Sequence, residues 1–197
     1  MPLSGRAKWF ILALGSLGFI GLCLVLALLA TLFWPSPWHK PHGTAAVQLG
    51  KQVQSRGMLQ VNQNHDGATE PAMAGGLECH AFKFYPGRPE QYAYFRIDPS
   101  LKRSGTNQLM VEVEYFDGEA GGNFRLDYDS YNGNSKDQGA YTQSKEKVYL
   151  KGTQRWRKAR FLLDDGRFEG RENDAADFRV TVVGGQFFLR SVKVLRE

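Results

Sequence analysis

The sequence predicts an all-β protein: an antiparallel β-sandwich or jelly roll of about eight or nine strands, preceded by one N-terminal transmembrane α-helix. Three observations support this. A long uninterrupted apolar run lies near the N-terminus, and no amphipathic helix of three turns follows residue 50. Short segments in which apolar and polar residues alternate then recur, separated by Gly, Asn and Asp turns about every ten residues. Such alternation is typical of strands with one buried face.

The apolar run extends over 26 residues, from Trp9 to Trp34, and contains no charged residue, His, Asn or Gln. As a helix it would be about 39 Å long, which exceeds a hydrocarbon core of about 30 Å. We therefore expect a transmembrane helix at 9–34. A cleaved signal peptide is the alternative, with Arg6 and Lys8 as its charged region, but its apolar part would normally be about 7 to 15 residues. A lipoprotein would need a small residue before Cys23, where Leu22 stands.

The charged residues around this run predict its orientation. Arg6 and Lys8 precede it and Lys40 follows it, a mild bias that places residues 1–8 in the cytoplasm. The protein is then a single-pass protein of the cell (inner) membrane whose C-terminal domain is periplasmic or extracellular. Small residues at every third position make a strip on the helix where a partner helix could pack closely: Gly15, Gly18 and Gly21.

Residues 35–50 read as a linker, because Pro35, Pro37 and Pro41 favour an extended chain. The exported domain is expected at 51–197. Beyond residue 40 the chain has 22 basic against 20 acidic residues, once Arg6, Lys8 and Lys40 are set aside. With no block of Lys and Arg, a nucleic-acid partner is not expected. Cys79 is expected to be a buried thiol, since Cys23 lies within the apolar run.

Alternation predicts strands within 51–61, 76–85, 91–97, 108–116, 123–129, 145–150, 159–163, 178–182 and 186–195. Gly184 and Gly185 read as a hairpin turn before the last strand, and residues 164–176 read as a long loop. The apolar members of these strands form the expected core: Phe95, Ile97, Leu109, Val111, Val113, Tyr115, Phe124, Leu126, Phe161, Leu163, Phe178, Val180 and Val182.

Three strand segments carry a resemblance to a known family. YFRID at 94–98, VEVEYFD at 111–117 and FRLDYDS at 124–130 resemble successive strands of galactose-binding-like β-sandwich modules. The resemblance continues through GTQRW at 152–156, FEGREN at 168–173 and ADFRV at 176–180, so it covers about residues 50–197. It implies a sandwich fold and a carbohydrate-binding function.

No cofactor is expected from the residues themselves. The resemblance implies a structural calcium ion in some modules of this kind, with Asp174 and Asp177 as candidate ligands. The pair Asp127 and Asp129, followed by Asn132 and Gly133, is only a partial calcium-loop pattern.

Catalytic patterns are absent from the sequence. The four histidines fit no H-E-x-x-H spacing, and there is no G-x-S-x-G. Glu112 with Glu114, and Asp127 with Asp129, could meet the spacing of glycosidase carboxylates, but solvated strand faces explain these pairs better. We expect no enzymatic activity.

Sugar recognition needs aromatic rings beside planar polar groups. Tyr92, Tyr94 and Arg96 alternate onto the face opposite Phe95, and Arg125 and Asp127 lie on the polar face of their strand. Trp156 is out of alternation with Ala159 and Phe161, so it is exposed or lies under a bulge. The candidate ligand-binding residues are Tyr92, Tyr94, Arg96, Arg125, Asp127 and Trp156. The tyrosines could instead pack under loops as an amphipathic second layer.

Two functions follow from these observations. The Gly strip and the lack of an attached enzyme favour a non-catalytic accessory protein whose sandwich clamps or stabilises a larger membrane assembly. The aromatic and Arg-bearing sheet face favours a carbohydrate-binding module at the cell surface or in the periplasm. The expected partners are the lipid bilayer, a membrane protein or complex, and a glycan.

Overall fold

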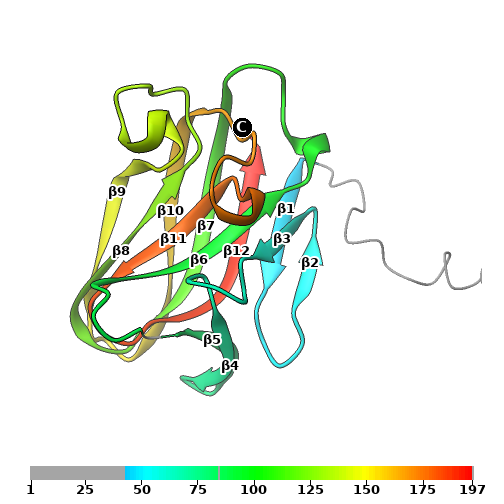
Figure 1. The fold of residues 1–197 in the computed structure, drawn as a ribbon. Coiled ribbons are helices and arrows are strands. Elements are labelled where there is room, and N and C mark those ends of the chain that lie inside the picture. The colour runs from blue at the N-terminus through cyan, green and yellow to red at the C-terminus, as the bar shows by residue number, and fades with distance from the viewer. Residues whose placement is uncertain (1–42, 84, 197) are drawn as a thin grey trace, which may run out of the picture. The chain divides into compact units, whose positions relative to one another are not determined.

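The computed structural model describes residues 43–83 and 85–196 (Figure 1). The expected cytoplasmic tail, the expected transmembrane helix with Gly15, Gly18 and Gly21, and most of the expected linker lie outside these residues. Within the described ranges, no helix combines the length and the apolar character needed to cross a membrane.

The described chain forms two antiparallel sheets, here called sheet A and sheet B. Sheet A has the order β10-β7-β12-β1-β2, with β5 also pairing with β12 and β4 with β5. Its strands are β1 (Thr44–Gln48), β2 (Gln54–Arg56), β4 (Thr69–Ala74), β5 (Leu77–Phe82), β7 (Asn107–Asp117), β10 (Arg155–Gly166) and β12 (Phe188–Arg196). Sheet B has the order β3-β6-β11-β8-β9. Its strands are β3 (Met58–Val61), β6 (Glu90–Ile97), β8 (Ala120–Tyr128), β9 (Thr142–Lys151) and β11 (Phe178–Val183).

Three short 3₁₀ turns complete the described structure: η1 (Pro99–Leu101), η2 (Lys136–Gly139) and η3 (Asn173–Ala175). Figure 1 shows the two sheets as layers facing each other. The expected all-β class and its antiparallel sandwich architecture are therefore confirmed.

The core lies between the two sheets and contains all thirteen residues that the sequence predicts for it. Phe95 of β6 stacks on Phe178 of β11, with ring centroids 5.3 Å apart. Tyr115 of β7 meets Phe124 of β8 edge-on at 4.8 Å, joining sheet A to sheet B. Because these apolar side chains point inward at every second position, the intervening polar residues must point outward, and this alternation positions the candidate site.

The structure begins its sandwich earlier than expected. Residues 44–48, predicted to belong to the linker, form β1, which pairs along its whole length with β12. Ala45 and Val47 are buried in the core. The small residues around them conceal the alternation, and the partner strand lies some 150 residues away in the chain, so local patterns do not reveal this strand.

Two further differences concern the number and length of strands. The described residues contain twelve strands rather than eight or nine. The unexpected β4 contains Pro71, which lacks the N–H that a central strand needs, but β4 pairs only with β5 and so lies at an edge. Strand β10 extends to Gly166, so the long loop starts later than residue 164.

Candidate functional site

The outer face of sheet B carries two rows of polar and aromatic residues across three strands. Arg179 on β11 lies opposite Tyr94 on β6 and Asp127 on β8. Two residues further along β11, Thr181 lies opposite Tyr92 and Arg125. The inward neighbours Phe178, Val180 and Val182 are all fully buried, so the alternation of β11 directs these two rows outward.

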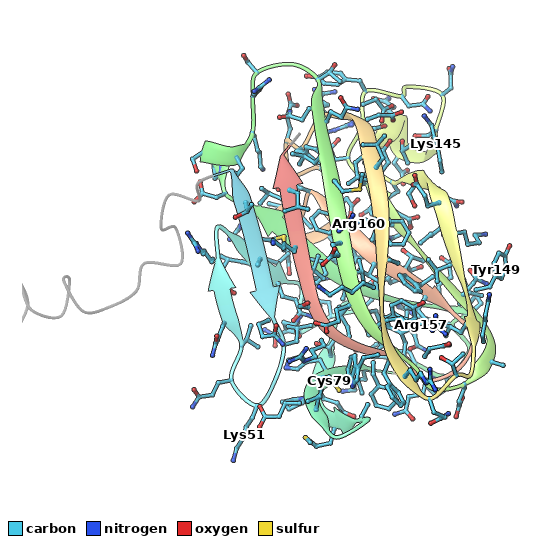
Figure 2. The ribbon with its side chains drawn as sticks, turned by 180° about the vertical axis from the view of Figure 1, so that it is seen from behind. Lys51, Cys79, Lys145, Tyr149, Arg157 and Arg160 are labelled. Carbon is cyan, nitrogen blue, oxygen red and sulfur yellow. The ribbon has the colours of Figure 1, made fainter. Side chains whose placement is uncertain are left out.

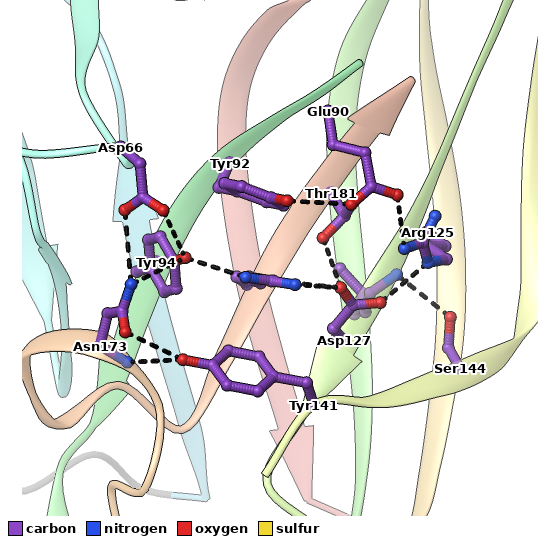
Figure 3. A network of polar contacts seen from close by, with 12 residues as sticks. Asp66, Glu90, Tyr92, Tyr94, Arg125, Asp127, Tyr141, Ser144, Asn173 and Thr181 are labelled. Carbon is purple, nitrogen blue, oxygen red and sulfur yellow. Dashed lines mark hydrogen bonds and ion pairs between the residues drawn. The ribbon is translucent and has the colours of Figure 1, made fainter. Parts of the chain in front are cut away.

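Arg179 is the centre of this face. Its Nε and Nη2 donate to Asp127 Oδ2 at 3.0 and 2.8 Å, and its Nη1 donates to Tyr94 Oη at 2.9 Å. The guanidinium carbon lies 4.0 Å from the centre of the Tyr92 ring and 4.4 Å from that of Tyr141. Tyr92 and Tyr141 lie on opposite sides of the network in Figure 3. The cation is thus held between two aromatic rings in a geometry that favours cation–π attraction.

The charge of Arg179 is stabilised in place. Burial by itself lowers the pKa of the guanidinium, but the negative charge of Asp127 and the hydrogen bonds around it raise the pKa above its ordinary value. Arg179 is therefore a permanent, oriented cation in an aromatic setting.

Asp127 and Glu90 supply the negative charges that balance Arg179 and Arg125. Asp127 also accepts from Arg125 Nε at 2.8 Å and from Thr181 Oγ1 at 2.8 Å. Glu90 accepts from Arg125 Nη2 and from Tyr92 Oη, both at 2.9 Å. Burial raises the pKa of Glu90, but Arg125 and Tyr92 more than offset this, so the pKa lies below its ordinary value. Burial and, to a smaller extent, the hydrogen bond to Glu90 raise the pKa of Tyr92 to about 12, so Tyr92 stays neutral.

Loops from three parts of the chain meet at the other end of the network. Tyr94 Oη donates to Asp66 Oδ2 at 3.3 Å, and Asn173 Nδ2 donates to Tyr94 Oη at 3.3 Å. Tyr141 Oη donates to Asn173 Oδ1 at 3.0 Å. Figure 3 shows Asp66, Tyr94, Asn173 and Tyr141 joined in this way. The loop that carries Asn173 holds three non-glycine residues at positive φ: Phe168, Asp174 and Ala175.

Two hollows open on this surface. The first, with a volume of about 340 Å³, is lined by the rings of Tyr92, Tyr94 and Tyr141, by Arg179, and by Glu90 and its neighbours. The second, of about 560 Å³, is lined by loop residues that include Asn62, His65 and Tyr85. Asp66, Arg88 and Asn173 line both, so the two hollows adjoin. We call them together the tyrosine groove.

Four of the six candidate residues lie together in this network: Tyr92, Tyr94, Arg125 and Asp127. Arg125 is buried and fully engaged by Glu90 and Asp127, so it supports the groove rather than lining it. Arg96 follows Tyr94 on the outer face of β6 and lies opposite Leu59 of β3, but it lines neither hollow.

Trp156 lies in the other sheet. It is on the outer face of sheet A, as its alternation predicts, but the β4–β5 hairpin covers it, whereas the sequence predicts an exposed side chain or one under a bulge. Its Nε1 donates to the Ala74 carbonyl at 3.2 Å and its ring lies 5.4 Å from that of Phe116. Trp156 packs with Cys79 in a second apolar cluster, so the fold separates it from the tyrosine groove.

Sequence reasoning missed several residues of the site. Arg179 alternates with Phe178 and Val180, so its outward direction could have been found, but its place beside Tyr94 depends on the pairing of β11 with β6. Asp66, Tyr141 and Asn173 lie in loops, where no periodicity marks them.

The residues considered for calcium do not fit a metal ion. Asp177 accepts from Lys102 Nζ and from the Ile97 N–H, both at 2.7 Å. Asp129 is engaged by Arg171, and Asp127 by Arg179. Cationic side chains thus occupy the positions that a metal would need, and Asp174 is exposed. Across residues 43–83 and 85–196, no group of three or more His, Cys, Asp or Glu is arranged to hold a metal.

No protein-family model matches this chain, and no curated protein matches it. Among solved structures, it is similar to the C-terminal CBM6 of LamC, a marine laminarinase from Zobellia galactanivorans, at 12% identity and a TM-score of 0.41, covering 78% of this chain and 99% of that one. It is similar to the carbohydrate-binding module CBM6cm-2 of Cellvibrio mixtus lichenase 5A, in complex with cellotriose, at 12% identity and a TM-score of 0.39, covering 78% and 97%.

A third similar structure is the CBM22-1 xylan-binding domain of Paenibacillus barcinonensis Xyn10C, at 8% identity and a TM-score of 0.43, covering 77% of this chain and 92% of that one. Similarity of this extent carries no functional argument.

Proposed function

We propose that the sandwich is a non-catalytic glycan-binding module and that the tyrosine groove is its binding site. The observation that carries the proposal is the arrangement of Tyr92, Tyr141 and Arg179: two rings held rigidly against one oriented cation, at the floor of an open hollow. Rigid aromatic surfaces suit the apolar faces of pyranose rings, and they lose little conformational entropy on binding.

The polar groups at the rim suit sugar hydroxyls. Asp66 offers carboxylate oxygens, Asn173 an amide, and Arg88 a guanidinium whose side chain is 57% exposed. Hydroxyl groups both donate and accept, so a mixed set of this kind matches them well. Asp66 and Glu90 stand beside Arg88 and Arg179 in the lining of the groove, so its charges balance and suit a neutral glycan.

A titration experiment tests this proposal. Full-length protein is kept in a detergent without a sugar headgroup and titrated calorimetrically with neutral β-glucan, xylan and galactan oligosaccharides. We expect binding to at least one class, and a loss of at least tenfold in affinity for Asp66→Ala and for Tyr92→Leu. The matched controls are Glu169→Ala and Tyr131→Leu, which remove an exposed carboxylate and an exposed ring outside the groove. If none of the oligosaccharides binds, the proposal is refuted.

Membrane anchoring is a separate proposal that rests on the sequence of residues 9–34. It would present the module in the periplasm or outside the cell, held to the inner membrane. The accessory function, in which Gly15, Gly18 and Gly21 pack against a partner helix, rests on the sequence alone, because these residues lie outside the described ranges. Glycan binding is the function we favour, because the tyrosine groove supports it.

A further inference from the structure

The consecutive strands β9 and β10 bring the edges of the two sheets together. Strand β9 is the last strand of sheet B and β10 the last strand of sheet A. Asp117, buried at the end of β7, holds the turn between them. Its carboxylate accepts from the N–H groups of Lys151 at 2.8 Å and Gly152 at 3.0 Å, and from Thr153 Oγ1 at 2.6 Å. These hydrogen bonds hold the turn that joins the two strands.

This edge is strongly basic. Between residues 145 and 160 the chain has seven Lys and Arg and one acidic residue, Glu146. All seven cationic side chains are exposed: Lys145, Lys147, Lys151, Arg155, Arg157, Lys158 and Arg160. Figure 2 shows Lys145, Arg157 and Arg160 on these two strands, together with Tyr149. We call this surface the basic edge.

Four of the seven cations have acidic partners. Lys145 pairs with Asp164, Arg157 lies 3.5 Å from Asp117, and Lys158 and Arg160 share Glu112. Within the described part of the chain, Lys147, Lys151 and Arg155 have no carboxylate at ion-pair distance. The basic edge thus keeps an uncompensated positive charge, although the domain as a whole is nearly neutral.

An aromatic ring stands within the row of cations. Lys147, Tyr149 and Lys151 occupy alternate positions of β9, at a spacing of about 6.7 Å, so they project on the same side of the strand. Tyr149 is 66% exposed, the most exposed large hydrophobic side chain in the described chain. These three residues line a groove of about 320 Å³ together with Val148, Arg157, and Tyr115 and Asp117 of β7.

We infer that the basic edge is a second binding surface, whose ligand is a linear acidic polysaccharide bearing carboxylate or sulfate groups. Its acidic groups would pair with Lys147, Lys151 and Arg155, and one sugar ring would stack on Tyr149. A row of charges that follows an extended strand matches the linear order of charges on such a chain. The inference does not depend on the tyrosine groove, whose lining carries carboxylates and guanidinium groups in balance.

The shape of the edge argues for a polysaccharide over an anionic membrane surface. Two of the three uncompensated cations, Lys147 and Lys151, line a groove, and a groove suits a single polymer chain better than a flat bilayer.

Affinity chromatography of the full-length protein in a neutral, sugar-free detergent tests this inference, with immobilised polygalacturonate as the probe. We expect retention at low salt and elution by sodium chloride, because screening weakens contacts between exposed charges. The triple variant Lys147→Gln, Tyr149→Ala, Lys151→Gln should lose at least tenfold in affinity. The control pair Lys51→Gln, Lys193→Gln removes the same charge from exposed positions outside the basic edge and should change affinity less than twofold.

Three further measurements separate the sources of binding. The variant Tyr149→Ala alone should weaken polygalacturonate binding at least threefold without a change in net charge. Equal losses in the triple variant and the control pair would show diffuse attraction and overturn the inference. Binding to phosphatidylserine vesicles with no binding to polygalacturonate would assign the surface to lipid and overturn it as well. Asp66→Ala should leave this binding unchanged, which separates it from the groove.

Discussion

The Arg179 guanidinium lies 2.8 Å from Asp127 Oδ2 in an ion pair that is almost entirely removed from solvent, with side-chain exposures of 9% and 2%. Without Arg179, Asp127 and Glu90 share Arg125, so the cluster keeps one uncompensated negative charge. We expect Arg179→Met to lower the free energy of unfolding by about 3 kcal/mol. Denaturant unfolding of the full-length protein, followed by circular dichroism, measures this. Arg160→Gln, which breaks an exposed ion pair, should change the free energy of unfolding by less than about 0.5 kcal/mol. Similar losses of stability in both variants would contradict a special contribution of the buried pair.

The β4–β5 hairpin depends on close contact at Gly75. A Cβ added at Gly75 would lie 2.6 Å from the Phe116 ring and 2.9 Å from Trp156 Nε1, whereas a Cβ at Gly76 would meet nothing within 4 Å. Both glycines have positive φ, so Ala strains the backbone at each. Gly75→Ala should therefore destabilise the protein by about 1 to 3 kcal/mol more than Gly76→Ala, because only the Cβ added at position 75 overpacks its neighbours. Equal unfolding midpoints for the two variants would count against this packing.

Glu172 makes stability depend on pH. Its carboxyl group is buried, neither oxygen has a hydrogen-bond partner in the described structure, and Arg179, Asp127, Asp129 and Asp177 surround it. Burial raises its pKa well above 4.5, and the three carboxylates add to this against the opposing effect of Arg179. The folded state therefore binds a proton more tightly than the unfolded state, and this contribution to stability is present below pH 4.5 and is lost as the pH rises.

Glu172→Gln should consequently stabilise the protein at pH 8, and its advantage over the parent should shrink as the pH falls toward 4.5. Thermal unfolding midpoints at a series of pH values measure this difference. Glu169→Gln, which makes the same substitution at an exposed position, is the matched control and is measured over the same pH series. A Glu172→Gln effect that is constant across the pH range would disprove the titration.

Cys79 should be inert while the protein is folded. Its side chain is fully buried, and burial raises the pKa of the thiol above its ordinary value, which disfavours the reactive thiolate. In a Cys23→Ser background, labelling by a maleimide should be at least a hundredfold slower in native buffer than in denaturant. Trp156→Ala opens the cover over Cys79 and should speed native labelling; rapid labelling of the parent protein would refute this burial.

The topology is also open to a direct test. With residues 9–34 as an uncleaved anchor and the N-terminus inside, protease added to intact spheroplasts should degrade the chain beyond residue 40. The same digestion after detergent lysis serves as the control for protease access. Complete protection in intact spheroplasts would reverse the orientation, and a mature chain that begins beyond Ala30 would show cleavage of a signal peptide.

The alternation of residues accounts for most of the fold. A strand with one buried face repeats every second residue, and this short-range pattern gave the class, most strands and all thirteen core residues. Alternation did not predict strands in which the pattern is weak or the pairing partner is distant in the chain. Strand β1 consists largely of small residues and pairs with β12 at the far end of the chain, and β4 carries a proline that only an edge strand tolerates.

The same distinction holds for the sites. Alternation alone placed Tyr92, Tyr94, Arg125 and Asp127 on one polar face, because direction from a strand is a local property. Arg179 becomes their partner only when β11 lies between β6 and β8, and Asp66, Tyr141 and Asn173 reach the groove only through the folding of three loops. For Trp156 the predicted outward direction is correct, but a hairpin from elsewhere in the chain covers the side chain. Contacts between distant segments depend on which strands pair, and the pattern of residues along one strand does not determine that pairing.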